Sequence, residues 1–189
     1  MKPLALLLGA MILPLPALAD VEAGSQKSAS CATCHGIDGN SPSGAYPNLA
    51  GQADEYLYKQ IKDFKEGRRP NAIMGTMIYS LSDQDMHDLA EFYSAQGPTP
   101  STFHTDPDKV ALGKKVAQDA QCAFCHQRNF KGLGLMPRVA GQQYNYVVKQ
   151  LKEFRDGVRT NDNGLMLQFT KNLTDDQIKA LAHYLISLY

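Results

Sequence analysis

The sequence predicts an all-α protein made of two tandem copies of one small helical domain. Apolar residues recur at helical spacing along the chain, whereas the alternating pattern of β-strands is scarce. The second half also repeats motifs of the first half at a constant offset of 90 residues. The matched segments are Pro47–Gln52 with Pro137–Gln142, and Tyr56–Asn71 with Tyr146–Asn161.

The middle helix of each copy is predicted from apolar residues three and four positions apart, followed by a glycine that ends the helix. In the first copy this helix covers about residues 53–66, and it places Leu57, Ile61 and Phe64 on one face. Its twin covers about residues 143–156.

The last helix of each copy opens with a capping signal, a hydroxyl residue followed three positions later by a side chain that can bond back. These pairs are Ser82 with Asp85 and Thr174 with Gln177. A proline directly after an N-cap residue also favours a helix start. A first helix of the second copy is therefore expected from Asp106-Pro107 onward, and a shorter version of it is expected in the first copy near residues 21–28.

The first residues have the pattern of a secretory signal peptide. Lys2 precedes an apolar run, and small residues stand where a signal peptidase would cut before Asp20. An uncleaved membrane anchor is the alternative, but the run is shorter than the ~20 residues of a spanning helix and is interrupted by Pro14 and Pro16. We expect a mature chain that begins at Asp20, lies in the periplasm, and is soluble or at most peripherally bound to the membrane.

The domain boundaries follow from the repeat and from a turn-rich segment at its centre. Residues 97–102 form a proline-stiffened stretch with little to bury. Domains so small struggle to build an adequate core from side chains alone, so a large apolar cofactor in each would supply the missing volume. We expect a signal peptide over residues 1–19, a first domain over 20–97, a linker over 98–106 and a second domain over 107–189.

Each copy contains two cysteines followed directly by a histidine, in the motifs Cys31–His35 and Cys122–His126. Two thiols at this spacing can reach the two vinyl groups of one porphyrin, and the adjacent histidine presents a ring nitrogen to the iron. We therefore expect two covalently bound c-type haems. The attachment residues are Cys31, Cys34, Cys122 and Cys125, and the proximal iron ligands are His35 and His126.

Two other uses of paired cysteines compete with haem attachment. A zinc site would join all four cysteines in one tetrahedron, which leaves both histidines unexplained. A thiol redox pair is expected beside a βαβ pattern, and the sequence has none. Haem explains every residue of both motifs.

The sixth iron ligand decides whether each iron is closed for electron transfer or open for chemistry. Met166 is the natural candidate in the second copy, and it lies 8 residues before the cap residue Thr174. In the first copy Met74 lies 8 residues before Ser82, so the repeat favours Met74, with Met77 as the fallback. A lone methionine is usually core filler, but two at matching offsets favour ligation. The thioether stabilises ferrous iron and raises the reduction potential.

The net charge of zero hides an asymmetry between the two copies. Residues 20–97 contain six Lys and Arg against eleven Asp and Glu, a balance of −5. Residues 98–189 contain twelve against eight, a balance of +4. Such a dipole would orient charged partners at low salt, although ordinary drift between duplicates would explain it equally well.

Four features of the chain occur together: both haem-attachment motifs, the repeated Pro-x-x-Ala-Gly-Gln segments, the Lys-Gln-[Ile/Leu]-Lys-[Asp/Glu]-Phe helices and the Leu-Ser-Asp-Gln-Asp cap. With these features the chain resembles the dihaem cytochrome c4 family. The resemblance covers nearly all of the mature sequence. It implies two class I cytochrome c domains related by an approximate twofold axis, with haem edges facing across the interface. It also implies that the Pro47 and Pro137 carbonyls accept the proximal histidine N–H, which fixes the ring orientation.

The second copy departs from the family pattern. The spacing from His126 to Pro137 is one residue shorter than that from His35 to Pro47, and the glycine-rich Gly36–Gly39 has no counterpart. The sequence therefore does not determine the geometry of its proximal loop, although it does identify the ligands.

The sequence therefore predicts an electron-transfer protein and not an enzyme. We expect it to pass single electrons between respiratory-chain components, from a quinol-oxidising complex toward a terminal oxidase, as a monomer that binds no nucleic acid. One alternative is a cytochrome subunit that accepts electrons from a periplasmic flavin or quinone dehydrogenase. Another is a dihaem peroxidase, which needs one iron with an open coordination position. A methionine ligand on each of the two irons would occupy that position.

The other histidines and the matched tyrosines have plain interpretations. His87, His104 and His183 have no counterparts in the other copy, so solvated or packing roles are expected for them. Tyr56 and Tyr146 do correspond, and we expect them in the core rather than at a haem propionate.

Overall fold

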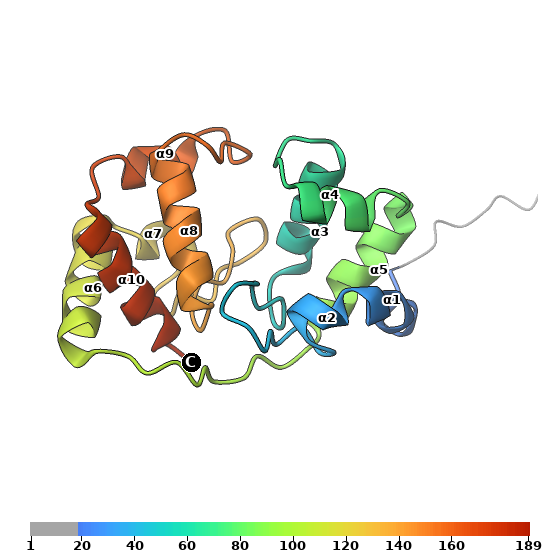
Figure 1. Cartoon of the computed structure of the whole chain (residues 1–189), viewed down its shortest axis with the longest axis horizontal. Helices are drawn as coiled ribbons and strands as arrows, with labels where there is room; N and C mark the ends of the chain where they lie inside the picture. Colours follow the sequence, from blue (N-terminus) through green and yellow to red (C-terminus); the bar gives the residue numbers. More distant parts are fainter. Residues whose placement is uncertain (1–18) are drawn as a thin grey trace, which may run out of the picture.

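The computed structural model describes residues 19–189 as two helical halves joined by an extended linker (Figure 1). Within this range the only β-pairing is one isolated bridge between Leu133 and Met136, which confirms the all-α prediction. The predicted signal peptide lies outside the described residues except for Ala19. The helices are α1 (Val21–Lys27), α2 (Ala32–His35), α3 (Asp54–Lys65), α4 (Ala72–Ile78), α5 (Asp83–Ser94), α6 (Pro107–Asp119), α7 (Ala123–His126), α8 (Tyr144–Arg155), α9 (Leu165–Thr170) and α10 (Asp175–Ile186), with a 3₁₀ turn η1 (Ser28–Ser30).

The first and last helices of each half cross at a glycine. A Cβ atom on Gly24 of α1 would lie 2.1 Å from the Asp88 carbonyl oxygen of α5. A Cβ atom on Gly113 of α6 would lie 2.1 Å from the Ala180 carbonyl oxygen of α10. No larger residue fits at these positions, so the two glycines set how closely the helices pack.

The helix ends agree with the capping signals. Ser82 and Thr174 each form a complete capping box, in which the hydroxyl accepts from the backbone N–H three residues on and the partner side chain bonds back. Asp106 caps α6 by accepting from two backbone N–H groups, with proline at the first helical position. These local bonds place the three helix starts where the sequence predicts them.

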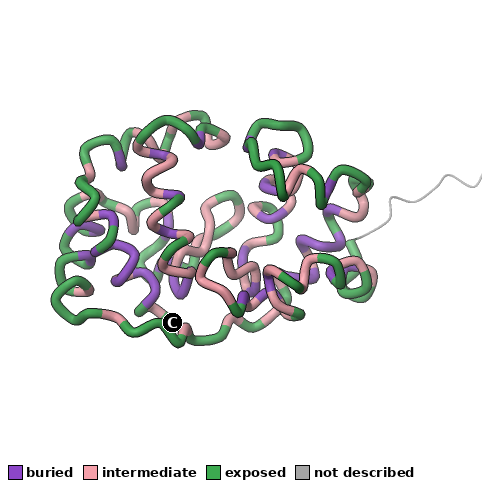
Figure 2. Tube along the Cα trace, viewed as in Figure 1, coloured by how far each residue is buried: buried purple, intermediate pink, exposed green. Residues whose placement is uncertain are grey.

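Each half has its own small apolar core (Figure 2). In the first half, Leu89, Ala90 and Phe92 of α5 pack against Leu57 of α3. In the second half, α10 supplies Leu181, Ala182 and Leu185 to a cluster that also contains Val116, Ala117, Phe130, Ala140 and Val147.

The middle helix of the first half departs from its predicted face. Leu57 is buried, but Ile61 and Phe64 are only half-buried, and the polar Gln60 and Asp63 are buried instead. The reason is a second packing partner: this side of α3 lies against the other half of the molecule, where polar side chains find partners.

The linker follows the surface and is held at both ends. Thr99 N–H donates to the Asn40 side chain, and the Tyr189 hydroxyl donates to the Pro98 carbonyl. Further on, the Phe103 ring stacks on Tyr144 at 4.6 Å and packs against His183, which is buried as a packing residue. Among the described residues, no helix is long and apolar enough to cross a membrane.

We predict that Gly24→Ala lowers the free energy of unfolding by about 3 kcal/mol, because the added methyl group meets backbone atoms that cannot move aside. Gly97→Ala is the control, since the space around Gly97 is open. Denaturant unfolding of both variants tests this. Equal losses in the two would contradict the close crossing.

Candidate haem sites

Both haem-attachment motifs form one-turn helices at the same place in their halves. Cys31 precedes α2 and Cys122 precedes α7, and each helix ends at its histidine. All four cysteines are of intermediate exposure, whereas His35 and His126 are buried. Within residues 19–189 no group of three or more His, Cys, Asp or Glu side chains is placed to hold a metal ion.

The two histidine rings are oriented by proline carbonyls. The His35 Nδ1 atom lies 3.0 Å from the Pro47 carbonyl oxygen, and the His126 Nδ1 atom lies 2.9 Å from the Pro137 carbonyl oxygen. Nδ1 is therefore the donor, and Nε2 of each ring is the unprotonated nitrogen that an iron can accept as ligand. Burial lowers the pKa of both rings more than the proline carbonyls raise it, which keeps the imidazoles neutral.

The shortened loop of the second half keeps the hydrogen bonds of the first. The Gly39 carbonyl accepts from the two N–H groups of Leu49 and Ala50, and the Phe130 carbonyl accepts from those of the equivalent Val139 and Ala140. Gly39 has φ +80°, whereas Phe130 adopts φ +56° without being a glycine. The loop geometry is therefore retained at a cost of about 1–2 kcal/mol for a side chain in this region.

The two candidate methionines occupy the first turns of matching short helices. Met74 is the third residue of α4, and its N–H donates to the Asn71 side chain at 2.9 Å. Met166 is the second residue of α9, and its N–H donates to Asp162 at 2.6 Å. Both are half-buried, whereas Met77 is 46% exposed.

The two halves are joined by a reciprocal pair of glutamines. Gln52 of the first half accepts from the Arg138 N–H at 2.7 Å and donates to the Arg138 carbonyl at 2.9 Å. Gln142 of the second half makes the same two bonds to Asn48, at 2.8 and 2.9 Å. Asn48 and Arg138 occupy equivalent positions in the repeat, so the contact has approximate twofold symmetry.

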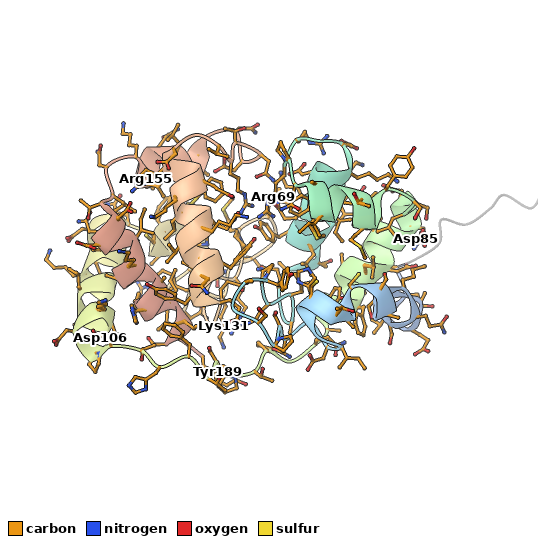
Figure 3. All side chains as sticks on the ribbon, viewed as in Figure 1. Arg69, Asp85, Asp106, Lys131, Arg155 and Tyr189 are labelled. Carbon is orange, nitrogen blue, oxygen red and sulfur yellow. The ribbon has the colours of Figure 1, made fainter. Side chains whose placement is uncertain are left out.

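A second twofold contact consists of two arginines and two glutamines, which we call the Arg-Gln ring. Arg69 donates to Gln60 at 3.0 Å and to Gln150 at 2.7 Å. Arg159 donates to Gln150 at 2.6 Å and to Gln60 at 2.9 Å. Each arginine therefore bonds the glutamine of its own half and that of the other half, and Figure 3 shows Arg69 between the two halves.

The matched tyrosines belong to this contact and not to either core. The Tyr146 hydroxyl accepts from Arg69 at 2.9 Å, and the Tyr56 hydroxyl accepts from Arg159 at 3.1 Å. Burial opposes ionisation of Tyr146, but the nearby guanidiniums outweigh it and lower the pKa of this hydroxyl. The expectation of a core position was therefore wrong, because the tyrosines bond across the interface.

The ring contains two buried positive charges whose hydrogen bonds go to neutral groups. Both guanidiniums are buried, and within residues 19–189 their bonding partners are neutral amides, hydroxyls and aromatic rings. Buried charges are normally paired, so this is a place that suits an anionic group. The porphyrin of a haem has two propionate carboxylates, and the residues present fit such a cofactor.

Gln60, Arg69 and their twins lie inside the repeated segments 56–71 and 146–161, but the sequence pattern alone gives them no role. One sequence pattern does indicate them: large polar residues recur unchanged in both copies beside an apolar helix face. In a duplicated chain, that pattern is typical of a self-complementary interface.

The repeat is not symmetric beside the ring. Asp63 is almost fully buried and is contacted by Lys59 at 2.5 Å, Arg68 at 2.7 Å and Asn161 at 2.6 Å. Its counterpart Glu153 has a side chain that is 28% exposed. A buried carboxylate therefore lies on one side of the interface only.

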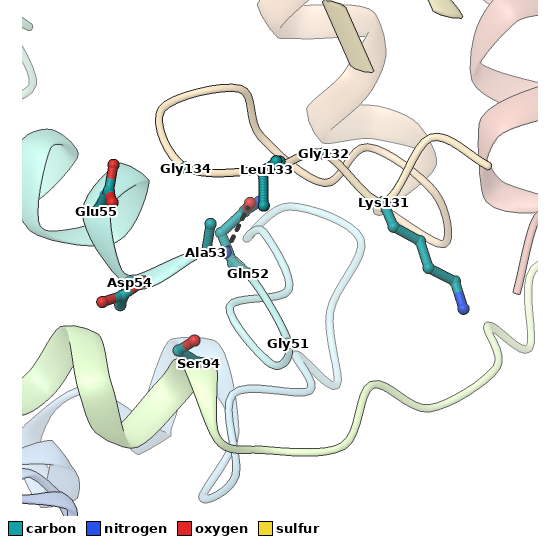
Figure 4. A pocket seen from close by; sticks show the side chains of 10 residues that line it. All are labelled: Gly51, Gln52, Ala53, Asp54, Glu55, Ser94, Lys131, Gly132, Leu133 and Gly134. Carbon is teal, nitrogen blue, oxygen red and sulfur yellow. Dashed lines mark hydrogen bonds between the residues drawn. The ribbon is translucent and has the colours of Figure 1, made fainter. Parts of the chain in front are cut away.

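A cleft of about 380 Å³ opens where the two halves meet (Figure 4). The first half contributes the start of α3, with Asp54 and Glu55. The second half contributes Lys131 and the turn that follows it, to Gly134. The interface is thus open at this edge, where Gln52 also lines the cleft.

Comparison with known proteins decides the family. The cytochrome c family profile matches twice, at residues 21–94 and 110–189. Cytochrome c4 of Pseudomonas aeruginosa is 38% identical, over 92% of this chain and 90% of its own. The chain belongs to the cytochrome c4 family. The crystal structure of reduced cytochrome c4 from Pseudomonas stutzeri matches with a TM-score of 0.85 at 37% identity, covering 90% of this chain and all of that one.

Family membership confirms two covalently bound c-type haems, one for each Cys-x-x-Cys-His motif, and an electron-carrying role. Another relative is named for a narrower role. The thiosulfate dehydrogenase electron acceptor of Thiomonas intermedia is 34% identical over 94% of this chain and 86% of its own.

We predict that Gln52→Ala lowers the free energy of unfolding by about 2 kcal/mol, because it removes two interdomain hydrogen bonds and leaves the Arg138 main chain unpaired. Gln26→Ala, at an exposed position within one helix, is the matched control. Guanidinium unfolding followed by far-ultraviolet circular dichroism measures both. The interface assignment fails if the two variants unfold alike.

Proposed function

We propose that this cytochrome c4 homologue carries single electrons in the periplasm, from a quinol-oxidising complex to a terminal oxidase. The observation that carries the proposal is the pair of proximal histidines, each fixed by a proline carbonyl, in halves that are bonded to each other through equivalent residues. A carrier with two bonded redox centres can accept an electron on one and release it from the other. The predicted signal peptide over residues 1–19 supports the periplasmic location.

We propose Cys31 and Cys34, and Cys122 and Cys125, as the attachment residues, with His35 and His126 as proximal ligands. Met74 and Met166 are proposed as the second axial ligands. Their support is the half-buried, matching position on α4 and α9 and the backbone bond that holds each helix start. Met77 is the weaker choice because its side chain is more exposed.

The bound haem supplies a one-electron couple between ferric and ferrous iron. The side chains and carbonyls of this chain would form the surroundings of that couple. Pro47 and Pro137 hold the histidine rings, and Arg69 and Arg159 supply two buried positive charges that would attract the propionates of a bound haem. Because these groups are fixed before the electron arrives, little rearrangement accompanies a change of oxidation state.

We predict that Met74→Ala and Met166→Ala each remove about half of the long-wavelength red band of Met-ligated ferric haem, because each leaves one iron without its thioether. The visible spectrum, with haem quantified per chain, measures this. Met77→Ala is the control and should keep the full band.

A full band in Met74→Ala would disprove that ligand and move the role to Met77. A high-spin component in the unmodified protein would mean an open iron face, and the peroxidase alternative would then be tested by peroxide turnover. Two low-spin haems with the full band support the electron carrier.

A second candidate is supported by the relative from Thiomonas intermedia, whose name gives it a dehydrogenase as electron donor. In that case this chain would accept electrons from a periplasmic dehydrogenase rather than from a quinol-oxidising complex. The fold and ligands would be the same, and only the donor would differ.

We predict that the rate of electron transfer with the physiological partner changes several-fold between low and physiological ionic strength, because the halves carry charge balances of −5 and +4 before haem is counted. Stopped-flow reduction by a quinol-oxidising membrane fraction and by a thiosulfate dehydrogenase compares the two donors. Fast reduction by the dehydrogenase alone would favour the second candidate. A rate with no salt dependence would contradict electrostatic steering.

A further inference from the structure

The start of α1 lies beside a buried carboxylate of α5. The Asp88 side chain is only 3% exposed, and its Oδ2 accepts from Lys27 at 2.5 Å. Its Oδ1 accepts from the main-chain nitrogen of Asp20 at 3.0 Å and from Gln84 at 2.8 Å. One oxygen of this buried carboxylate is therefore shared between Gln84 and the main chain of Asp20, the residue directly before α1. The helices α1 and α5 lie against each other (Figure 1).

The charges around Asp88 are unbalanced. Among residues 19–189, Lys27 is the one cation that pairs with it, and Lys27 also pairs with Asp85 at 3.0 Å. The Asp20 carboxylate adds a further negative charge nearby, where it caps α1 by accepting from Glu22 N–H. One cation thus serves several carboxylates, and a second cation at this place would be stabilising.

The sequence supplies such a cation. The small residues before Asp20 predict a signal-peptidase site between Ala19 and Asp20. Hydrolysis there adds water across the Ala19–Asp20 peptide bond, which leaves a carboxylate on Ala19 and a free amine on Asp20. The amine takes up a proton at neutral pH, since its ordinary pKa is about 7.7–8.0. The nitrogen that now donates one hydrogen to Asp88 would then be an ammonium.

We propose that Asp88 is the receptor for the α-ammonium of Asp20, so that removal of the leader creates an ion pair that fastens α1 to α5. Processing at this bond is then part of the folding of the first domain as well as of export. The occupant is the new chain end of this protein itself.

The second half is an internal comparison. Gly24 packs against the Asp88 carbonyl in the same way as Gly113 packs against the Ala180 carbonyl, so Ala180 occupies the position of Asp88. Asp20 lies four residues before Gly24, and Lys109, four residues before Gly113, lies inside α6. In that half the chain continues upstream into the linker, and no carboxylate stands at this position.

The hydrogen bonds at Asp88 agree with an anionic receptor. Burial opposes its ionisation, but the bonds from Lys27, Gln84 and the Asp20 main chain together outweigh burial and lower the pKa of the carboxyl. The titratable groups that face the new ammonium are Asp88 on α5, Lys27 and the Asp20 carboxylate on α1, and Asp85 through Lys27.

The test uses the exported holoprotein. Intact mass should show a chain that begins at Asp20. The pKa of the α-amine, measured by its rate of acylation against pH, should lie about one unit above the ordinary value and fall back in Asp88→Asn, which corresponds to about tenfold slower acylation near pH 7 in the unmodified protein. Glu91→Gln is the matched control, because Glu91 lies on the same helix and forms no ion pair among the described residues.

A second variant retains one extra alanine before Asp20 after processing, which moves the ammonium away from Asp88. It should have an ordinary α-amine pKa and a lower thermal midpoint than the unmodified protein. The loss should be present below pH 7.7 and shrink as the pH rises through the raised pKa, because only the protonated amine pairs. This variant keeps the proposal testable if Asp88→Asn does not fold.

Three outcomes would overturn the proposal. The mature chain could begin at another residue, the α-amine could titrate alike in Asp88→Asn and Glu91→Gln, or the extra alanine could leave both the pKa and the thermal midpoint unchanged. In the last two cases Lys27 would be the one cation paired with Asp88 among the described residues.

Discussion

The short segment Pro47–Gln52, with its twin Pro137–Gln142, is the constraint on which the rest of the molecule depends. Its proline carbonyl orients the proximal histidine, and the next residue bonds through its main chain to a glutamine of the other half. Its last residue, Gln52 or Gln142, reaches across to the same segment of the partner half. One stretch of backbone therefore holds the ligand ring and the domain contact together, so the position of each histidine is tied to the orientation of the halves.

The sequence predicts the helices and the haem motifs well because these depend on local patterns. Capping boxes at Ser82 and Thr174 and the stop after each middle helix act within a few residues. The Arg-Gln ring could not be predicted in this way, because the contacts of Arg69 and Gln60 join residues about 80–100 positions apart. On a single domain these residues have the pattern of an ordinary polar helix face, and only pairing of the two copies buries them.

The proximal loop of the second half shows which constraint prevails when sequence and geometry conflict. Glycines at positions 36 and 39 adopt positive φ without cost, whereas Gln127 and Phe130 adopt φ +65° and +56° with side chains attached. The hydrogen bond from His126 and the two bonds to the Phe130 carbonyl are kept nonetheless. The Phe130 ring is buried in the core and packs edge-on against Tyr184, and this apolar burial offsets the backbone strain.

The twofold contact is conserved between the halves, but the charges beside it are not. Asp63 is buried next to Lys59, Arg68 and Asn161, whereas its counterpart Glu153 faces solvent more and bonds to Gln150. A change at such a position alters the electrostatic surroundings of one half without breaking a bond of the Arg-Gln ring or of the glutamine pair. Duplication thus separates two tasks: residues on the symmetry axis hold the halves together, and residues beside it are free to differ in burial and charge between the halves.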